Sequence, residues 1–224
     1  MEDARAYEEL RVGFTAAVSH ELRTPLARLM ALLDSATLPG ADQNALLAQA
    51  REEVEEMTEL VNDVLFLSEL ESGREVVALG DTPVLPVLEE VCDRLADSAE
   101  RADVAIRVEA DPPDVGLPLR RRMLQTIVAN LAQNAIRYAG PGSTLTVAAG
   151  PGLLEVSDDG RGVEEEELPR LFERFFRGDR ARASRGSGLG LAIVKHVVAS
   201  AGGEIDASGG PGRGLRIVCR FPAP

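Results

Sequence analysis

The sequence has little cysteine, no long apolar run and too few basic residues to balance its acidic ones. Its two cysteines, Cys92 and Cys219, are too few and too far apart for a disulfide framework or a metal site of ordinary spacing. We therefore expect them to be core residues in a reducing cytoplasmic setting. No segment approaches the roughly 20 consecutive apolar residues of a membrane-spanning helix. A signal-peptide pattern is also missing at the N-terminus.

Positive charge is scarce as well. The 224 residues include 37 acidic and 24 basic side chains, which gives a net charge of -13. Such a charge argues against nucleic acid or an anionic membrane surface as the main partner. The hydrophobic content of 45% is enough for a core, and the length suits two domains.

The N-terminal third reads as two long helices. A helical pattern runs from about Ala4 to Leu38, ends at the turn Pro39-Gly40, and resumes after Asp42 as far as about Ser72. Each helix carries apolar residues three and four apart, the spacing of a coiled-coil or bundle seam. These residues are Leu22, Leu26, Leu29 and Leu33 in the first helix, and Leu47, Ala50, Val54, Met57, Val61 and Val64 in the second. A lone hairpin would expose this seam, so we predict a homodimer that completes a four-helix bundle.

After Ser72-Gly73 the pattern changes to short mixed elements, and this change predicts domains at 1–72 and 73–224. The second domain reads as an α+β sandwich, with helices on one face of a mixed sheet. Its predicted strands are Val76–Leu79, Val104–Val108, Thr144–Ala148, Leu153–Ser157 and Leu215–Phe221, and its predicted helices are Val84–Arg101, Met123–Tyr138 and Leu189–Ser200. The start of the first of these helices is marked by Thr82-Pro83, and no internal repeat is visible.

One histidine stands out in the first helix. His20 is followed by Glu21, lies two positions before the apolar seam, and should point away from it. An exposed imidazole beside a carboxylate is a candidate nucleophile, although most surface histidines on helices are inert. Pro25 favours a functional reading, because a proline inside a helix removes a backbone hydrogen bond and costs about 3 kcal/mol.

Three clusters in the second domain carry polar or flexible residues that suit a nucleotide. Asn130, Asn134 and Arg137 share one helical face, where amide oxygens suit Mg²⁺ and a guanidinium suits phosphate. A polar surface face is the simpler reading of that cluster alone. Two glycine clusters follow, at 158–162 and at 186–190.

The first glycine cluster, Asp158-Asp159-Gly160-Arg161-Gly162, reads either as a turn or as a loop that approaches a planar ligand, with Asp158 accepting from an exocyclic amine. The second, Gly186 to Gly190, opens a helix and can surround phosphate oxygens with backbone amides. It does not have the dinucleotide-binding spacing. The preceding loop, Gly178 to Arg185, contains three arginines and reads as a mobile lid over a nucleotide.

Taken together, the chain resembles the sensor histidine kinases of bacterial two-component signalling over essentially its whole length. Five segments carry the resemblance in the family's order: the phosphoacceptor box Ser19 to Pro25, the asparagine box Asn130 to Tyr138, the first glycine box Asp158 to Gly162, the phenylalanine box Phe172 to Arg177, and the second glycine box Gly186 to Gly190. The resemblance implies the histidine kinase and gyrase-type ATPase fold. Gyrase-type topoisomerases, heat-shock chaperone ATPases and anti-sigma-factor kinases share that fold but lack the His20 to Pro25 motif.

The family pattern implies a role for each matching residue. His20 would attack the γ-phosphate of ATP, Glu21 would accept a proton or hydrogen bond from the ring, and Arg177 would approach the γ-phosphate. Asn134 would ligate Mg²⁺, and Asp158 would recognise the adenine amine. The other residues implied in nucleotide binding are Asn130, Arg137, Tyr138, Gly160, Gly162, Gly186, Ser187, Gly188, Leu189 and Gly190.

The resemblance also implies partners and a second activity. The chain would dimerise and pass its phosphate to the receiver domain of a response regulator. Thr24, three residues after Glu21, would orient water to dephosphorylate that regulator. The chain would then be the cytoplasmic portion of an inner-membrane sensor, whose membrane contact lies in a missing N-terminal region. A dimeric scaffold that binds ATP without transferring phosphate is the alternative.

Three positions depart from the family pattern. Asp159 stands where asparagine is usual and adds negative charge near the expected nucleotide. Ser187 stands where threonine is common, and either hydroxyl can donate to a phosphate. His196 comes five residues before Ala201, the position where relatives often carry a histidine, and we interpret it as structural.

Overall fold

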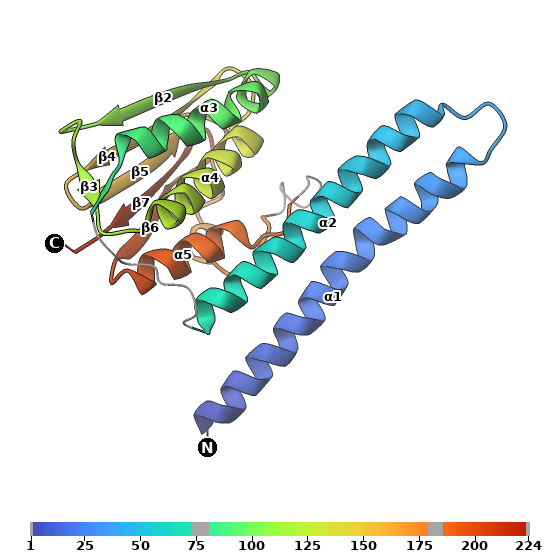
Figure 1. The fold of residues 1–224 in the computed structure, drawn as a ribbon, viewed down its shortest axis with the longest axis horizontal. Coiled ribbons are helices and arrows are strands. Elements are labelled where there is room, and N and C mark those ends of the chain that lie inside the picture. Colours follow the sequence, from blue (N-terminus) through green and yellow to red (C-terminus); the bar gives the residue numbers. More distant parts are fainter. Residues whose placement is uncertain (1, 73–80, 179–185, 223–224) are drawn as a thin grey trace. The chain divides into compact units, whose positions relative to one another are not determined.

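The computed structural model describes residues 2–72, 81–178 and 186–222, and side chains from residue 17 onward. By its internal contacts the chain forms two compact units, one of residues 1–66 with 184–187 and one of residues 67–183 with 188–224. Figure 1 shows the first unit as a helical hairpin and the second as a sheet with helices on one face. Within the described part of the chain, no helix combines the length and apolar character needed to span a bilayer.

The hairpin consists of α1 (Glu2–Ala36) and α2 (Gln43–Glu71). The predicted N-cap is confirmed, because the Ala45 N–H donates to the Asp42 carboxylate at 3.1 Å. Pro25 lies inside α1 and is buried, and the helix continues through it. Both long helices therefore end close to where the sequence predicts.

The apolar residues of the hairpin form two stripes instead of the single predicted seam. One stripe is buried or half-buried: Leu22, Pro25, Leu29 and Leu32 in α1, with Ala50, Met57, Leu60 and Val64 in α2. The other stripe is exposed: Leu26, Met30 and Leu33 in α1, with Leu47, Val54, Val61 and Leu65 in α2. The predicted seam contains residues of both stripes. An apolar seam whose spacing does not match the helical repeat shifts around the helix, so its residues can face two different neighbours.

The second unit contains a mixed sheet of five strands in the order β2-β4-β5-β7-β6. The strands are β2 (Val104–Ala110), β4 (Ser143–Gly150), β5 (Leu153–Asp158), β6 (Glu204–Gly209) and β7 (Leu215–Arg220). β2 pairs with β4 in parallel, and the other neighbours are antiparallel. The predicted mixed sheet is thus confirmed, and β6 is an additional strand that the sequence pattern did not predict.

Three helices cover one face of this sheet: α3 (Leu85–Ala102), α4 (Arg121–Tyr138) and α5 (Gly190–Ser200). The core lies between them and the sheet. β4 alternates buried and half-buried residues along its length, and α4 buries eight side chains, so one face of each element is removed from water. Cys92 and Cys219 are both buried there, as predicted.

Smaller elements complete the unit. Thr82–Pro83, expected to mark a helix start, forms the short strand β1 and pairs with β3 (Gly116–Leu117), while Pro86 lies in the first turn of α3. The single-turn helix η1 spans Leu168–Arg170. The predicted strand Val76–Leu79 and most of the predicted lid, Gly178 to Arg185, lie outside the described residues.

Candidate functional site

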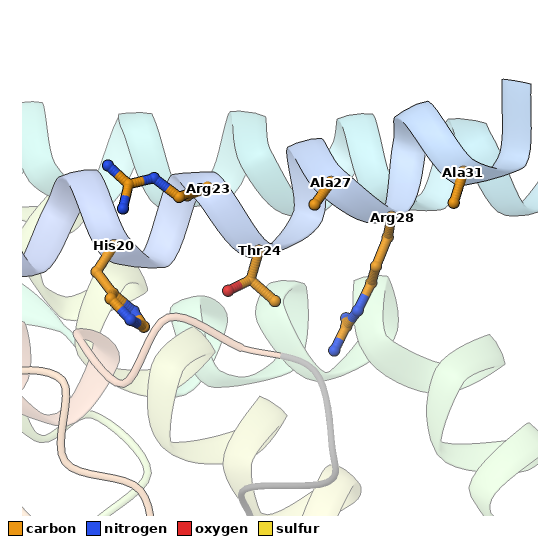
Figure 2. A pocket seen from close by; sticks show the side chains of 6 residues that line it. All are labelled: His20, Arg23, Thr24, Ala27, Arg28 and Ala31. Atoms are coloured by element: carbon orange, nitrogen blue, oxygen red, sulfur yellow. The ribbon is translucent and has the colours of Figure 1, made fainter. Parts of the chain in front are cut away.

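The candidate phosphoacceptor side chain, His20, is exposed on α1. Figure 2 shows that His20, Thr24 and Arg28 extend from the same side of the helix, whereas Arg23 turns away. The spacing of four residues between successive members explains this, because it brings side chains one above another on a helix. These four residues, with Ala27 and Ala31, line an open pocket along α1. The pocket is therefore separate from the exposed apolar stripe.

Glu21 and Pro25 differ from their neighbours in burial. Glu21 is half-buried and Pro25 is buried. His20, which precedes Glu21, and Thr24, which precedes Pro25, are exposed. Successive side chains on a helix diverge by about 100 degrees. Glu21 therefore starts from a different face than His20, and it can reach the imidazole only by curving around the helix.

In the second unit, α4 carries the asparagine cluster on its polar side. Asn130 and Asn134 are half-buried, whereas Arg137 is exposed. The Asn130 amide nitrogen donates to the carbonyl oxygen of Thr126 at 2.9 Å. Its oxygen lies against the start of α5, since a Cβ atom added at Gly190 would be 2.4 Å from Asn130 Oδ1. A Cβ at position 190 would thus force the Asn130 side chain to move.

The first glycine cluster begins at the last residue of β5. Asp158 Oδ1 accepts a hydrogen bond from the Gly160 N–H at 3.0 Å, which closes a tight turn over the carboxylate. The loop then lies against the end of α4: the Arg161 N–H donates to the Ala139 carbonyl at 2.9 Å. A Cβ at Gly160 would be 2.3 Å from that same carbonyl oxygen. Glycine is therefore required for the loop to approach the helix end.

Asp158 is half-buried, and its environment acts on its pKa in two directions. Burial raises the pKa, because a desolvated carboxylate loses hydration, and the nearby Asp159 raises it further. Backbone N–H bonds from Gly160 and Leu215 oppose this by stabilising the charged form. A carboxylate offers about four acceptor positions. The two backbone bonds therefore leave acceptor capacity for a further donor such as an exocyclic amine.

Asp159, the departure from the family pattern, is directed at the sheet. Its Oδ1 accepts a hydrogen bond from the Thr144 N–H at 2.6 Å, and its own N–H donates to the Thr144 carbonyl at 3.3 Å. An asparagine oxygen could accept the same bond. Asp159 therefore joins the loop to the start of β4, a structural role that either residue type can fill.

The second glycine cluster is divided between the two compact units, with Gly186 and Ser187 in the first and Gly188 to Gly190 in the second. Gly188 has φ +68°, and a Cβ there would be 2.9 Å from the Cα of Phe175. The Phe175 N–H donates to the Gly188 carbonyl at 3.0 Å. Leu189 is buried, and α5 begins at Gly190. The cluster thus leads directly into a helix N-terminus, as predicted.

The phenylalanine cluster contains an unusual backbone conformation. Phe175 has φ +60°, which is uncommon for a residue with a bulky side chain. Its contact with Gly188 holds it there and links the two clusters. The guanidinium of Arg170 stacks over the Phe176 ring at 4.4 Å from its centroid. Sequence reasoning did not foresee the left-handed Phe175, because no local pattern predicts it.

The oxygen donors of the second unit suit a cation that binds together with a nucleotide. Among the described residues, no cluster of three or more histidine, cysteine or acidic side chains could hold a metal ion by itself. The polar side of α4 supplies half-buried amides at Asn130 and Asn134. Mg²⁺ takes one or two protein oxygens and keeps waters and phosphate oxygens as its other ligands. Such a sparse set of protein ligands suits Mg²⁺ bound to ATP.

Comparisons with known proteins agree with the two units. The His Kinase A (phospho-acceptor) domain matches residues 10–73, and the Histidine kinase-, DNA gyrase B-, and HSP90-like ATPase matches residues 119–224. Sensor-like histidine kinase SenX3 of Mycobacterium tuberculosis is 37% identical over 231 residues, which cover 99% of this chain and 56% of SenX3. Phosphate regulon sensor protein PhoR of Pseudomonas aeruginosa is 36% identical over 226 residues, which cover 96% of this chain and 50% of PhoR.

The chain thus spans about half the length of these curated relatives. A solved structure of histidine kinase ThkA in complex with response regulator protein TrrA matches with a TM-score of 0.75 and 21% identity, covering 100% of this chain and 65% of that chain. At this identity the likeness concerns the fold alone. The phospho-acceptor hairpin, the ATPase domain and the full-length relatives agree with the motifs in the sequence, and the chain belongs to the sensor histidine kinase family.

Proposed function

We propose that this chain phosphorylates its own His20 with the γ-phosphate of ATP and then transfers the phosphate to an aspartate of a response-regulator receiver domain. One observation carries the proposal. The chain has two histidines, and His20 is the exposed one, on the helix matched by the phospho-acceptor domain. His196 is half-buried in α5. An accessible imidazole is needed to reach a phosphorus atom held by another domain.

In this proposal the ATPase domain, matched over residues 119–224, holds the nucleotide. Asp158 accepts from the adenine amine, Asn134 provides an oxygen to Mg²⁺, and Arg177 approaches the γ-phosphate. Asn130, Arg137 and Tyr138 of α4 shape the phosphate site with the glycine clusters, whose members are Gly160, Gly162, Gly186, Ser187, Gly188, Leu189 and Gly190. Mg²⁺ would neutralise phosphate charge. Catalysis of phosphoryl transfer consists mainly of such neutralisation and of positioning.

The transfer step uses residues of α1. A His20 ring nitrogen forms a bond to the γ-phosphorus, and the bond to the bridging oxygen breaks so that ADP leaves. Glu21 takes the ring proton or accepts a hydrogen bond from the ring, which makes the imidazole a better nucleophile. The half-buried starting position of Glu21 requires its side chain to curve towards His20 for this role.

The first test is incubation with γ-labelled ATP and Mg²⁺. We expect the wild type to acquire an acid-labile, base-stable label and His20→Gln to acquire none. The matched control is His196→Gln, which should label like the wild type. Asn134→Ala should reduce labelling at least tenfold, because one amide ligand to Mg²⁺ is lost. Label on His20→Gln would refute the assignment of the phosphoacceptor.

The scaffold alternative predicts a different result from the same experiment. A non-enzymatic dimer would bind ATP in an equilibrium assay, yet neither the wild type nor any variant would acquire label. Nucleotide binding without labelling would therefore replace the kinase proposal with the scaffold. The presence of all five motifs in the order typical of the family favours the kinase.

We also propose that Thr24 supports dephosphorylation of the regulator. Thr24 is exposed and lies on the same side of α1 as His20, so its hydroxyl can orient water near a phosphoaspartate docked at this face. Thr24→Ser keeps the hydroxyl and is the matched control for Thr24→Ala.

The measurement uses a receiver domain that the labelled protein itself phosphorylates. Thr24→Ala should autophosphorylate normally and remove the aspartyl phosphate at least tenfold more slowly than the wild type. Thr24→Ser should retain most of the activity. An unchanged rate of dephosphorylation in Thr24→Ala would show that this residue has no such role.

The proposed partners follow from two faces of the hairpin. The exposed apolar stripe on the hairpin suits a second copy of the same hairpin, and the His20 face suits a receiver domain of the kind present in the ThkA complex. We also propose that the chain works on the cytoplasmic side of a membrane together with a sensor region, as the names of its relatives suggest.

A further inference from the structure

The turn between β6 and β7, residues 209–214, lies against the loop that carries Asp158. Its sequence is Gly-Gly-Pro-Gly-Arg-Gly. Two backbone hydrogen bonds join the turn to the loop: the Gly212 N–H donates to the Arg161 carbonyl at 2.8 Å, and the Gly214 N–H donates to the Gly160 carbonyl at 3.0 Å. The turn is therefore fixed to the loop by its main chain, whatever side chains surround it.

The approach of the two segments is closer than a side chain would allow. Gly214 has φ +69°, and a Cβ there would be 1.7 Å from the carbonyl oxygen of Asp158. From the other side, Gly162 has φ +67°, and its Cβ would be 2.0 Å from the Gly210 carbonyl oxygen. Carbon and oxygen atoms without a bond between them cannot approach so closely. Glycine is thus required on both sides of the contact.

The turn also acts on the Asp158 carboxylate through the loop. The Gly160 N–H donates to this carboxylate at 3.0 Å, while the Gly160 carbonyl accepts from the Gly214 N–H at 3.0 Å. Gly160 is thus held between the carboxylate and the turn. The direction in which the carboxylate points therefore depends on where the β6–β7 turn places Gly160.

We propose that the β6–β7 turn, through Gly214 and its hydrogen bond to Gly160, positions Asp158 and so determines the preference for a purine base that carries an exocyclic amine. This inference rests on the proposed contact between Asp158 and the adenine amine. Gly214 is a positioning residue, because it acts on the base through Asp158. The ion pair between Arg213 and Glu165, at 2.7 Å, is exposed and contributes little to holding the turn.

The turn provides its own matched control. Gly212 has φ +70°, nearly the same as Gly214, but a Cβ there would meet no atom within 4 Å. Gly212→Ala and Gly214→Ala therefore impose the same backbone strain, and only the second forces the turn away from Asp158. Neither glycine belongs to the residues proposed to touch the nucleotide.

The experiment compares equilibrium dissociation constants for ATP and for purine riboside triphosphate, which lacks the amine. The wild type should favour ATP by about 10-fold or more, the contribution of one hydrogen bond to a carboxylate. Gly212→Ala should keep this ratio. In Gly214→Ala the ratio should fall close to one, mainly through weaker ATP binding. A ratio in Gly214→Ala equal to that of the wild type would overturn the inference.

Two further outcomes separate this inference from the base contact on which it rests. If Asp158→Ala removes the preference and Gly214→Ala does not, the base contact holds and the positioning role fails. If the wild type shows no preference, or if Asp158→Ala keeps one, the base contact itself is wrong and the inference fails with it.

A second measurement applies if Gly214→Ala does not unfold cooperatively. Amide hydrogen exchange in Asp158→Ala, with Gly214 unchanged, tests the bond between the Gly160 N–H and the carboxylate. The Gly160 amide should exchange at least tenfold faster than in the wild type, while the Gly212 amide, bonded to the Arg161 carbonyl, should keep its rate. An unchanged Gly160 rate would overturn the positioning role.

Discussion

At the scale of single residues, burial and hydrogen bonding act in opposite directions on the pKa of the Asp158 carboxyl. Asp158 has backbone donors on two sides, yet burial still raises the pKa of its carboxyl above the usual value of 3.8. A raised pKa means that the folded chain holds the proton more tightly than the unfolded chain. The free energy of unfolding therefore falls as the pH rises from 3.8 through the raised pKa.

Asp158→Asn should separate function from stability. The amide carries no charge to desolvate, so the variant should be at least as stable as the wild type at pH 7, and its stability should lose this pH dependence. ATP affinity should fall by about 5-fold to 10-fold, since the hydrogen bond to a charged acceptor becomes one to a neutral amide oxygen. Urea unfolding at several pH values and equilibrium ATP binding check the two effects. Lower stability with unchanged binding would contradict this account.

At the scale of elements, the sequence predicts where helices lie better than what they contact. Asp42 begins α2 as its position after Pro39-Gly40 suggests, because a cap acts within a single turn. The seam is harder to predict. Leu22 and Leu26 belong to one predicted stripe, yet Leu22 is half-buried and Leu26 is 48% exposed. Which neighbour a helical face meets depends on tertiary packing, which periodicity does not specify.

Asp42→Ala should loosen the first turn of α2. Loss of an N-cap costs about 0.5–2 kcal/mol, typically near 1, so amide exchange in the first turn should accelerate about fivefold. Asp34→Ala, near the end of α1, is the control and should leave that exchange unchanged, since an acid near a helix C-terminus stabilises nothing. Equal exchange rates in Asp42→Ala and the wild type would show that the cap contributes little.

At the scale of the whole molecule, the exposed apolar stripe of the hairpin predicts that the hairpin associates with a partner. Leu47, Val54 and Val61 are 53%, 49% and 43% exposed and lie seven residues apart. Val54 and Val61 therefore fall on almost the same line along α2. Large exposed apolar surfaces of this kind mark association sites. His20 and Thr24 lie on another face, so a dimer formed through this stripe would leave the proposed phosphoacceptor accessible.

Val54→Glu combined with Val61→Glu should convert the dimer into a monomer, because two charges would be buried in an apolar seam. Sedimentation equilibrium should show twice the chain mass of 23.9 kDa for the wild type and the single mass for the variant. Ala48→Glu combined with Asn62→Glu adds the same charge at exposed positions of α2 outside the stripe and should remain dimeric. A dimer that survives the first pair of changes would place the interface elsewhere.

The sequence by itself determined the local features of this protein: the two long helices, the three helices over a mixed sheet, and the five motifs that identify the family. Each helix, strand and motif is encoded within a few turns or a short loop. Only the tertiary structure decided which helical faces are buried and which glycines contact distant parts of the backbone. The contact of Gly214 with Asp158 joins residues 56 positions apart in the sequence, and the left-handed Phe175 is held by Gly188. Such contacts depend on how strands are ordered in the sheet, and local periodicity carries no information about that order.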